Sequence, residues 1–143
     1  MTEYGKGYVS GILDLAAENL SGMGVSMIEA RTFEKDKIAK GLEEIFGKDI
    51  MSDAVLLEDV HVEAAGILRA RTEEDERAVS KVMGLLEWML GEAEAFARFP
   101  EERQLREQIS GYNGNDEFFY YVEDIALLIF KDAGVLIVIG NDE

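Results

Sequence analysis

The sequence contains no cysteine, and this absence excludes several kinds of site at once. A chain without thiols forms no disulfide, holds no zinc–thiolate or iron–sulfur centre and offers no cysteine nucleophile. Histidine and tryptophan occur once each, as His61 and Trp88, and Pro100 is the only proline. A serine–histidine mechanism would have to use His61, whose sequence neighbours include neither a serine nor a group to orient the ring. These absences favour a protein that is not an enzyme.

Basic residues are also scarce: 14 Lys and Arg stand against 30 Asp and Glu, which gives a formal charge of -16. Such a charge repels nucleic-acid phosphates and anionic membranes, whereas it permits a basic protein partner or a divalent cation. No apolar run approaches the roughly 18–20 residues that span a bilayer, and residues 1–8 do not resemble a secretion signal. We therefore expect a single cytoplasmic domain over residues 1–143, without nucleic-acid or membrane contacts.

The longest predicted element is a helix over residues 72–99. Thr72 is a good N-cap, acidic residues follow it in the first turn, and Pro100 closes the stretch. At 100° per residue, one broad face of this helix is apolar, as expected of a helix that faces a core. That face consists of Val79, Val82, Met83, Leu86, Met89, Leu90, Ala93, Phe96 and Ala97.

The opposite side of the same helix has fewer charges than a solvent-exposed face normally carries. It contains Gly84, Trp88, Gly91 and Ala95, and two glycines inside a helix each cost about 1 kcal/mol relative to alanine. Small residues beside a tryptophan suggest a place where another chain packs closely. We therefore predict an interface here, with a homo-oligomer, most simply a dimer, as its product; the alternative is that the glycines are tolerated and Trp88 is simply half exposed.

Seven further segments carry the patterns of helices and strands. The predicted helices cover residues 8–20, 101–109 and a stretch from residue 35 or 36 to residue 46, which Gly47 ends. The predicted strands cover residues 25–33, 118–122, 125–130 and 135–139, with a loop over residues 110–116. The last two strands form a hairpin, and Gly134 suits the positive φ that its turn requires.

Residues 52–71 fit two structures. Alternation favours a strand over residues 55–62 and a second over residues 67–71, whereas a helix over residues 52–68 also matches the apolar spacing. On a strand, Asp59, His61 and Glu63 share one face, and carboxylates with one imidazole suit Mg²⁺, Mn²⁺ or Fe²⁺. On a helix, His61 turns away from the two carboxylates and the metal site is lost.

Together these segments predict an α+β fold: an antiparallel sheet of four to five strands packed on one long helix. The order of elements from residue 25 to residue 130 is compatible with a ferredoxin-like core that carries an extra N-terminal helix and a C-terminal hairpin. Because the hairpin strands are apolar on both faces, we expect a cover on each side: the long helix on one, and the first helix or a neighbouring chain on the other.

Surplus apolar surface without an assembled catalytic set favours a non-enzymatic, cytoplasmic binding or regulatory protein that acts as a homo-oligomer. One alternative is a metal-dependent enzyme or metal-binding regulator that uses Asp59, His61 and Glu63. Another is an acidic decoy that occupies a basic or nucleic-acid-binding protein. No organic cofactor is expected, because the sequence contains neither a phosphate-binding glycine loop nor a dinucleotide fingerprint.

Overall fold

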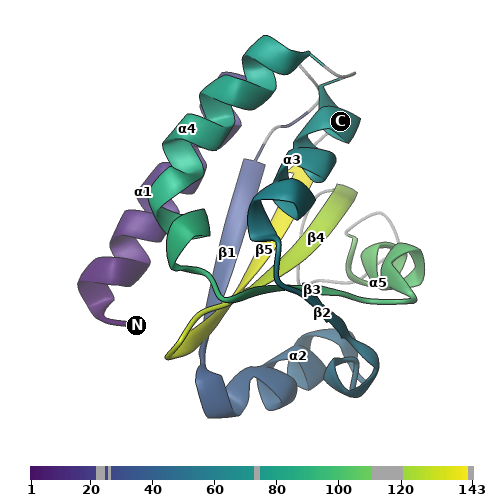
Figure 1. Cartoon of the computed structure of the whole chain (residues 1–143). Helices are drawn as coiled ribbons and strands as arrows, with labels where there is room; N and C mark the ends of the chain where they lie inside the picture. Colours follow the sequence, from purple (N-terminus) through teal and green to yellow (C-terminus); the bar gives the residue numbers. More distant parts are fainter. Residues whose placement is uncertain (22–24, 26, 73–74, 111–120, 142–143) are drawn as a thin grey trace.

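A computed structural model describes residues 1–21, 25, 27–72, 75–110 and 121–141 of the chain (Figure 1). Its α-helices are α1 (Glu3–Leu20), α2 (Ile38–Phe46), α3 (Val60–Arg71), α4 (Glu76–Glu92) and α5 (Glu102–Ile109). Its strands are β1 (Met27–Glu34), β2 (Val55–Leu57), β3 (Ala95–Arg98), β4 (Tyr121–Ile129) and β5 (Ala133–Asn141). Among the described helices, none has both the length and the apolar character that a membrane span requires.

The five strands form one antiparallel sheet in the order β1-β5-β4-β3-β2. This confirms the predicted α+β class and the antiparallel sheet. The ferredoxin-like core is wrong, because the strand that it requires over residues 67–71 belongs to α3. The strands at the two edges of the sheet differ in length: β1 has 8 residues and β2 has 3.

Helices cover both faces of the sheet, α1, α3 and α4 on one and α2 and α5 on the other (Figure 1). The apolar core between the sheet and α1, α3 and α4 is called the first core, and the one between the sheet and α2 and α5 the second core. In β4, Ala126 and Leu128 belong to the first core, whereas Leu127 and Ile129 belong to the second. The apolar side chains of β5 are all buried in the same alternating way. The hairpin is therefore covered on both sides by its own chain and offers no apolar face to a neighbour, which removes the hairpin as a reason to expect self-association.

The strands predicted over residues 52–71 are wrong beyond Leu57, since a helix takes up most of this segment. The Asp59 carboxylate caps α3 by accepting a hydrogen bond from the Val62 amide at 3.2 Å. Val60, Ala65 and Leu68 then pack into the first core at helical spacing. The helix provides hydrogen bonds for the backbone groups and buries the apolar residues of one face. This segment is therefore helical, although the alternation of its residues predicts strands.

The helix predicted over residues 72–99 is too long at both ends. Its N-cap is Asp75, whose carboxylate accepts from the amides of Arg77 and Ala78, while the Thr72 hydroxyl donates to the Leu68 carbonyl at the end of α3. Its last residue is Glu92, and the chain then enters β3, which pairs with β2 and β4. Strand pairing on both sides of β3 accounts for a short strand where local spacing predicted helix.

Gly47 and Gly134 are the glycines predicted at a helix end and at a turn. Gly47 ends α2 in the left-handed conformation with φ 74°, as predicted. Gly134 is wrong as a positive-φ residue, because Gly47 is the only such glycine in the described part of the chain. A Cβ at Gly134 would lie 2.6 Å from the Ile38 Cδ1 atom, so glycine is needed there for the close approach of α2. Residues 111–116 of the predicted loop and residues 118–120 of the predicted strand lie outside the described residues.

Candidate functional site

The three residues predicted to share a strand face do not converge. Asp59 is the N-cap of α3, and His61 in the first turn is exposed to solvent. The Glu63 carboxylate accepts a hydrogen bond from Arg98 Nε on β3 at 2.6 Å and is only 16% exposed. Within the described residues there is no group of three or more His, Asp or Glu side chains placed to hold a metal ion. The geometric basis of the predicted metal site is therefore lost with the strand.

The predicted interface residues on α4 do lie on one surface, with one exception. Gly84, Trp88 and Gly91 are exposed on the side of α4 that faces away from the sheet, and the Trp88 side chain remains 45% exposed. Ala95 is wrong as a member, because it lies in β3, is 9% exposed and packs in the second core with α2 and α5. The interface prediction therefore keeps three of its residues.

Helix α1 adds a second apolar stripe beside this one. Tyr4, Tyr8, Gly11 and Leu15 recur at intervals of four, three and four residues, which places them along one side of the helix. The tyrosines are 83% and 44% exposed and Leu15 is 49% exposed. We call the combined surface the α1–α4 face: Tyr4, Tyr8, Gly11 and Leu15 with Gly84, Trp88 and Gly91.

One ring contact joins the two stripes. The Tyr8 and Trp88 rings meet edge to face, with their centroids 5.0 Å apart and their planes at 79°. Tyr8 lies in the first half of α1 and Trp88 near the end of α4, so the two helices run antiparallel, as Figure 1 shows. The contact fixes both rings while almost half of each remains open to solvent. A pre-arranged aromatic pair of this kind is typical of an anchor at an interface.

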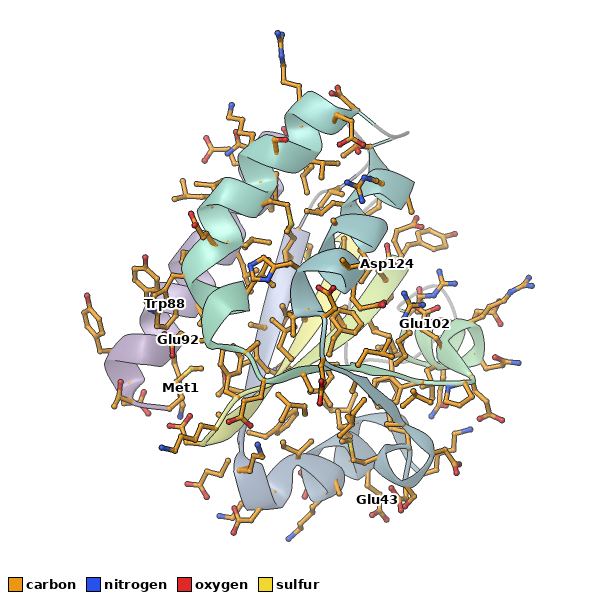
Figure 2. The ribbon with its side chains drawn as sticks, in the orientation of Figure 1. Met1, Glu43, Trp88, Glu92, Glu102 and Asp124 are labelled. Carbon is orange, nitrogen blue, oxygen red and sulfur yellow. The ribbon has the colours of Figure 1, made fainter. Side chains whose placement is uncertain are left out.

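A hollow of about 470 Å³ opens at the end of the α1–α4 face. Figure 2 shows Met1, Trp88 and Glu92 beside one another at this place. The hollow is lined by Met1, Thr2, Tyr4, Gly5, Tyr8, Trp88, Glu92, Phe130, Lys131 and Asp132. Its volume lies in the range of sites that accept a small molecule or a large side chain, and its aromatic walls continue the α1–α4 face.

An ion pair forms one border of the hollow. The Met1 amino group lies 2.6 Å from the Asp132 carboxylate. The hydrogen bond from this amino group, helped by its positive charge, lowers the pKa of Asp132 below the ordinary value of 3.8. The pair joins the start of α1 to the turn between β4 and β5, so the aromatic part of α1 is held against the sheet at this end.

The glycines of the α1–α4 face are not required by packing within the chain. A Cβ built at Gly11, Gly84 or Gly91 would meet no other atom within 4 Å. Each glycine therefore weakens its helix without relieving a clash inside this fold. The missing side chains leave the face shallow between its aromatic and aliphatic residues.

Trp88 is recognisable from the sequence, whereas its neighbours on α1 are not. The predicted first helix began at residue 8, whereas α1 begins at Glu3 behind a Thr2 cap, so Tyr4 was not counted on any helix face. The available signal was the outward stripe through Tyr4, Tyr8, Gly11 and Leu15, which runs opposite the buried one. Pairing α1 with α4 was needed to see that both stripes form one surface.

No family model, curated protein sequence or solved structure matches the chain.

Proposed function

We propose that this chain is a non-enzymatic, cytoplasmic binding protein that acts as a homodimer through the α1–α4 face. The observation that carries the proposal is the Tyr8–Trp88 pair, whose rings are fixed against each other yet 44% and 45% exposed. Large contiguous apolar patches commonly mark interaction sites, and the exposed aromatic residues of this face lie next to one another. A second copy would cover the rings and the open glycines beside them.

Symmetry favours the same face as the partner surface. In a two-fold dimer the same patch serves both copies, so it must complement itself. The α1–α4 face offers projecting rings at Tyr4, Tyr8 and Trp88 and shallow positions at Gly11, Gly84 and Gly91. Rings of one copy can therefore pack over the glycines of the other, as small residues permit close approach of helices.

Charge opposes the association of two copies and makes it dependent on salt. Each chain carries a formal charge of -16, so the copies repel one another at low ionic strength. Added salt screens this repulsion over about 8–10 Å at physiological ionic strength. We therefore expect the dimer to tighten as sodium chloride rises, which is the opposite of an association held by ion pairs.

The test is the mass of the chain in solution, measured by analytical ultracentrifugation for the wild type and for Trp88→Glu. Loss of a central tryptophan typically costs about 2 kcal/mol or more, and a two-fold dimer loses two of them, so association through this face should weaken at least roughly 30-fold. The matched control is Val62→Glu, which adds the same charge at an exposed apolar position of α3 that is 59% exposed and outside the face. A wild-type chain that stays monomeric at about 100 µM in high salt, or equal weakening by both variants, would refute the proposal.

A further inference from the structure

The outer edge of β1 is long, regular and only partly covered. β1 pairs with β5 over eight consecutive positions without a register shift, whereas the β4–β5 ladder contains one between Val122 and Asp124. Among the described strands β5 is its sole neighbour, so its other edge closes the sheet on that side. Residues 29–33 are all partly exposed. Such an edge can pair with another extended chain.

Several of the devices that protect edge strands are missing from β1, although two charged residues lie inside it. Natural edges are interrupted by proline, by lysine and other charged residues, by bulges, or by very short strands, as β2 is with its 3 residues. The segment Met27–Glu34 contains neither proline nor lysine, and its ladder is unbroken. Its charged residues between the two ends are Glu29 and Arg31, which lie on the same face of the strand.

These two charges complement themselves in one antiparallel register. Two copies of β1 can pair about a two-fold axis perpendicular to the sheet. Directly opposed residues then lie on the same face, so the axis must pass midway between the two copies of one residue, which therefore faces itself. An axis through Ala30 places Glu29 opposite Arg31 of the second copy, and Met27 opposite Phe33. An axis through Glu29 or Arg31 would instead place that charge opposite itself, which destabilises a strand pair.

We propose that β1 pairs with β1 of a second copy, antiparallel and centred on Ala30, to give a continuous ten-stranded sheet. Glu29 and Arg31 already contact each other within one strand at 2.8 Å, and their side chains are 36% and 38% exposed. In the paired edge each of them also faces the opposite charge across the axis, twice per interface. This surface is separate from the α1–α4 face, and neither proposal rests on the other. A chain that uses both contacts assembles beyond a dimer, whereas a chain restricted to one contact stops at a dimer.

The experiment isolates the β1 edge by starting from the Trp88→Glu chain, in which the α1–α4 face is disabled. That chain should still form dimers by ultracentrifugation at about 100–200 µM. Adding Glu29→Arg places two arginines opposite two arginines, and adding Arg31→Glu places glutamates opposite glutamates. Each single reversal should weaken the dimer about tenfold or more, because like charges face each other at both ends of the pair.

Rescue between chains separates this contact from any effect within one strand. An equimolar mixture of the two single-reversal chains should restore association as heterodimers, and the double reversal Glu29→Arg/Arg31→Glu should restore it in one chain. A Trp88→Glu chain that stays monomeric at about 200 µM would overturn the proposal, as would dimers that ignore both reversals or a mixture that fails to recover. In a chain that keeps Trp88, Arg31→Glu should leave the α1–α4 dimer intact. Each contact can therefore be measured in a chain in which the other contact is disabled.

Discussion

Replacement of Gly84 by alanine should stabilise the folded monomer and weaken the dimer at the same time. Gly84 lies inside α4, where glycine is unfavourable, and a Cβ at this position would meet nothing within 4 Å. Packing inside the chain therefore gives no reason for the glycine. If a second copy packs over the position, the same methyl group fills space that the partner needs.

The magnitude follows from helix propensity and from chain length. Glycine in an exposed helix interior costs about 1 kcal/mol relative to alanine, so Gly84→Ala should gain about that much in the free energy of unfolding. For 143 residues the entropy of unfolding near the midpoint is roughly 0.3 kcal/mol per kelvin, which converts the gain to an increase of roughly 3 °C in Tm. Overpacking at a helix interface commonly costs 1–3 kcal/mol, so the dimer Kd should rise about tenfold or more.

The assay combines two measurements on the same variant. Thermal unfolding by circular dichroism, at a concentration low enough for monomer, reports the intrachain gain, and ultracentrifugation at higher concentration reports the dimer Kd. Gly66→Ala is the matched control, since Gly66 is also open, exposed and inside a helix, but lies on α3 outside the α1–α4 face. A lower Tm for the Gly84→Ala monomer, or a dimer Kd that changes equally in both variants, would refute the reasoning.

Three further outcomes test contacts elsewhere in the fold. Asp59→Ala should lower the free energy of unfolding by about 1 kcal/mol in urea titrations through loss of the α3 cap, whereas the exposed His61→Ala should change it by less than about 0.5 kcal/mol. Gly134→Ala should destabilise the chain by about 1–3 kcal/mol, because its Cβ would lie 2.6 Å from Ile38 Cδ1, and an unchanged urea midpoint would contradict this packing. The lowered pKa of Asp132 stabilises the fold above its unfolded value near 3.8, and that contribution is lost as the pH falls through the lower folded value. The Tm advantage of the wild type over Asp132→Asn should therefore be present at about pH 5 and shrink towards about pH 2.

The spacing of apolar residues predicts the secondary structure correctly in segments where a single periodicity dominates. The buried residues of α1 (Val9, Ile12, Leu13, Ala16, Ala17 and Leu20) follow helical spacing without competition, and the predicted helix there is confirmed apart from its start. The hairpin of β4 and β5 is also predictable, because its strands are apolar and joined by a turn. In these segments local preference and tertiary packing agree.

The same spacing predicts the wrong secondary structure where hydrogen bonds between distant segments determine it. Phe96 and Ala97 fit the helical face of the preceding residues by spacing, yet they lie in β3. The Glu94 amide donates to the Ile129 carbonyl at 2.7 Å and draws the chain into the sheet directly after α4. Spacing alone cannot reveal this bond, because its acceptor lies 35 residues further along the chain.

The candidate site was predictable in part for a related reason. Trp88 stood out because an aromatic residue occupied the side of a helix opposite its core face. Tyr8 gains its significance only from the 5.0 Å contact with Trp88, and that contact depends on how α1 and α4 pair. The metal hypothesis failed because it required a strand where Asp59 begins a helix.

The most direct test of the α1–α4 dimer is the fluorescence of Trp88 in the Arg31→Glu chain, in which β1 cannot pair with itself, over a dilution series from about 100 µM to 0.1 µM. Trp88 is the only tryptophan in the chain, so all indole emission comes from the proposed interface. Burial against a second copy predicts a red shift on dilution, with a midpoint equal to that of the dimer-to-monomer transition in ultracentrifugation. Emission that stays constant while the mass halves would place the dimer contact elsewhere and contradict the account.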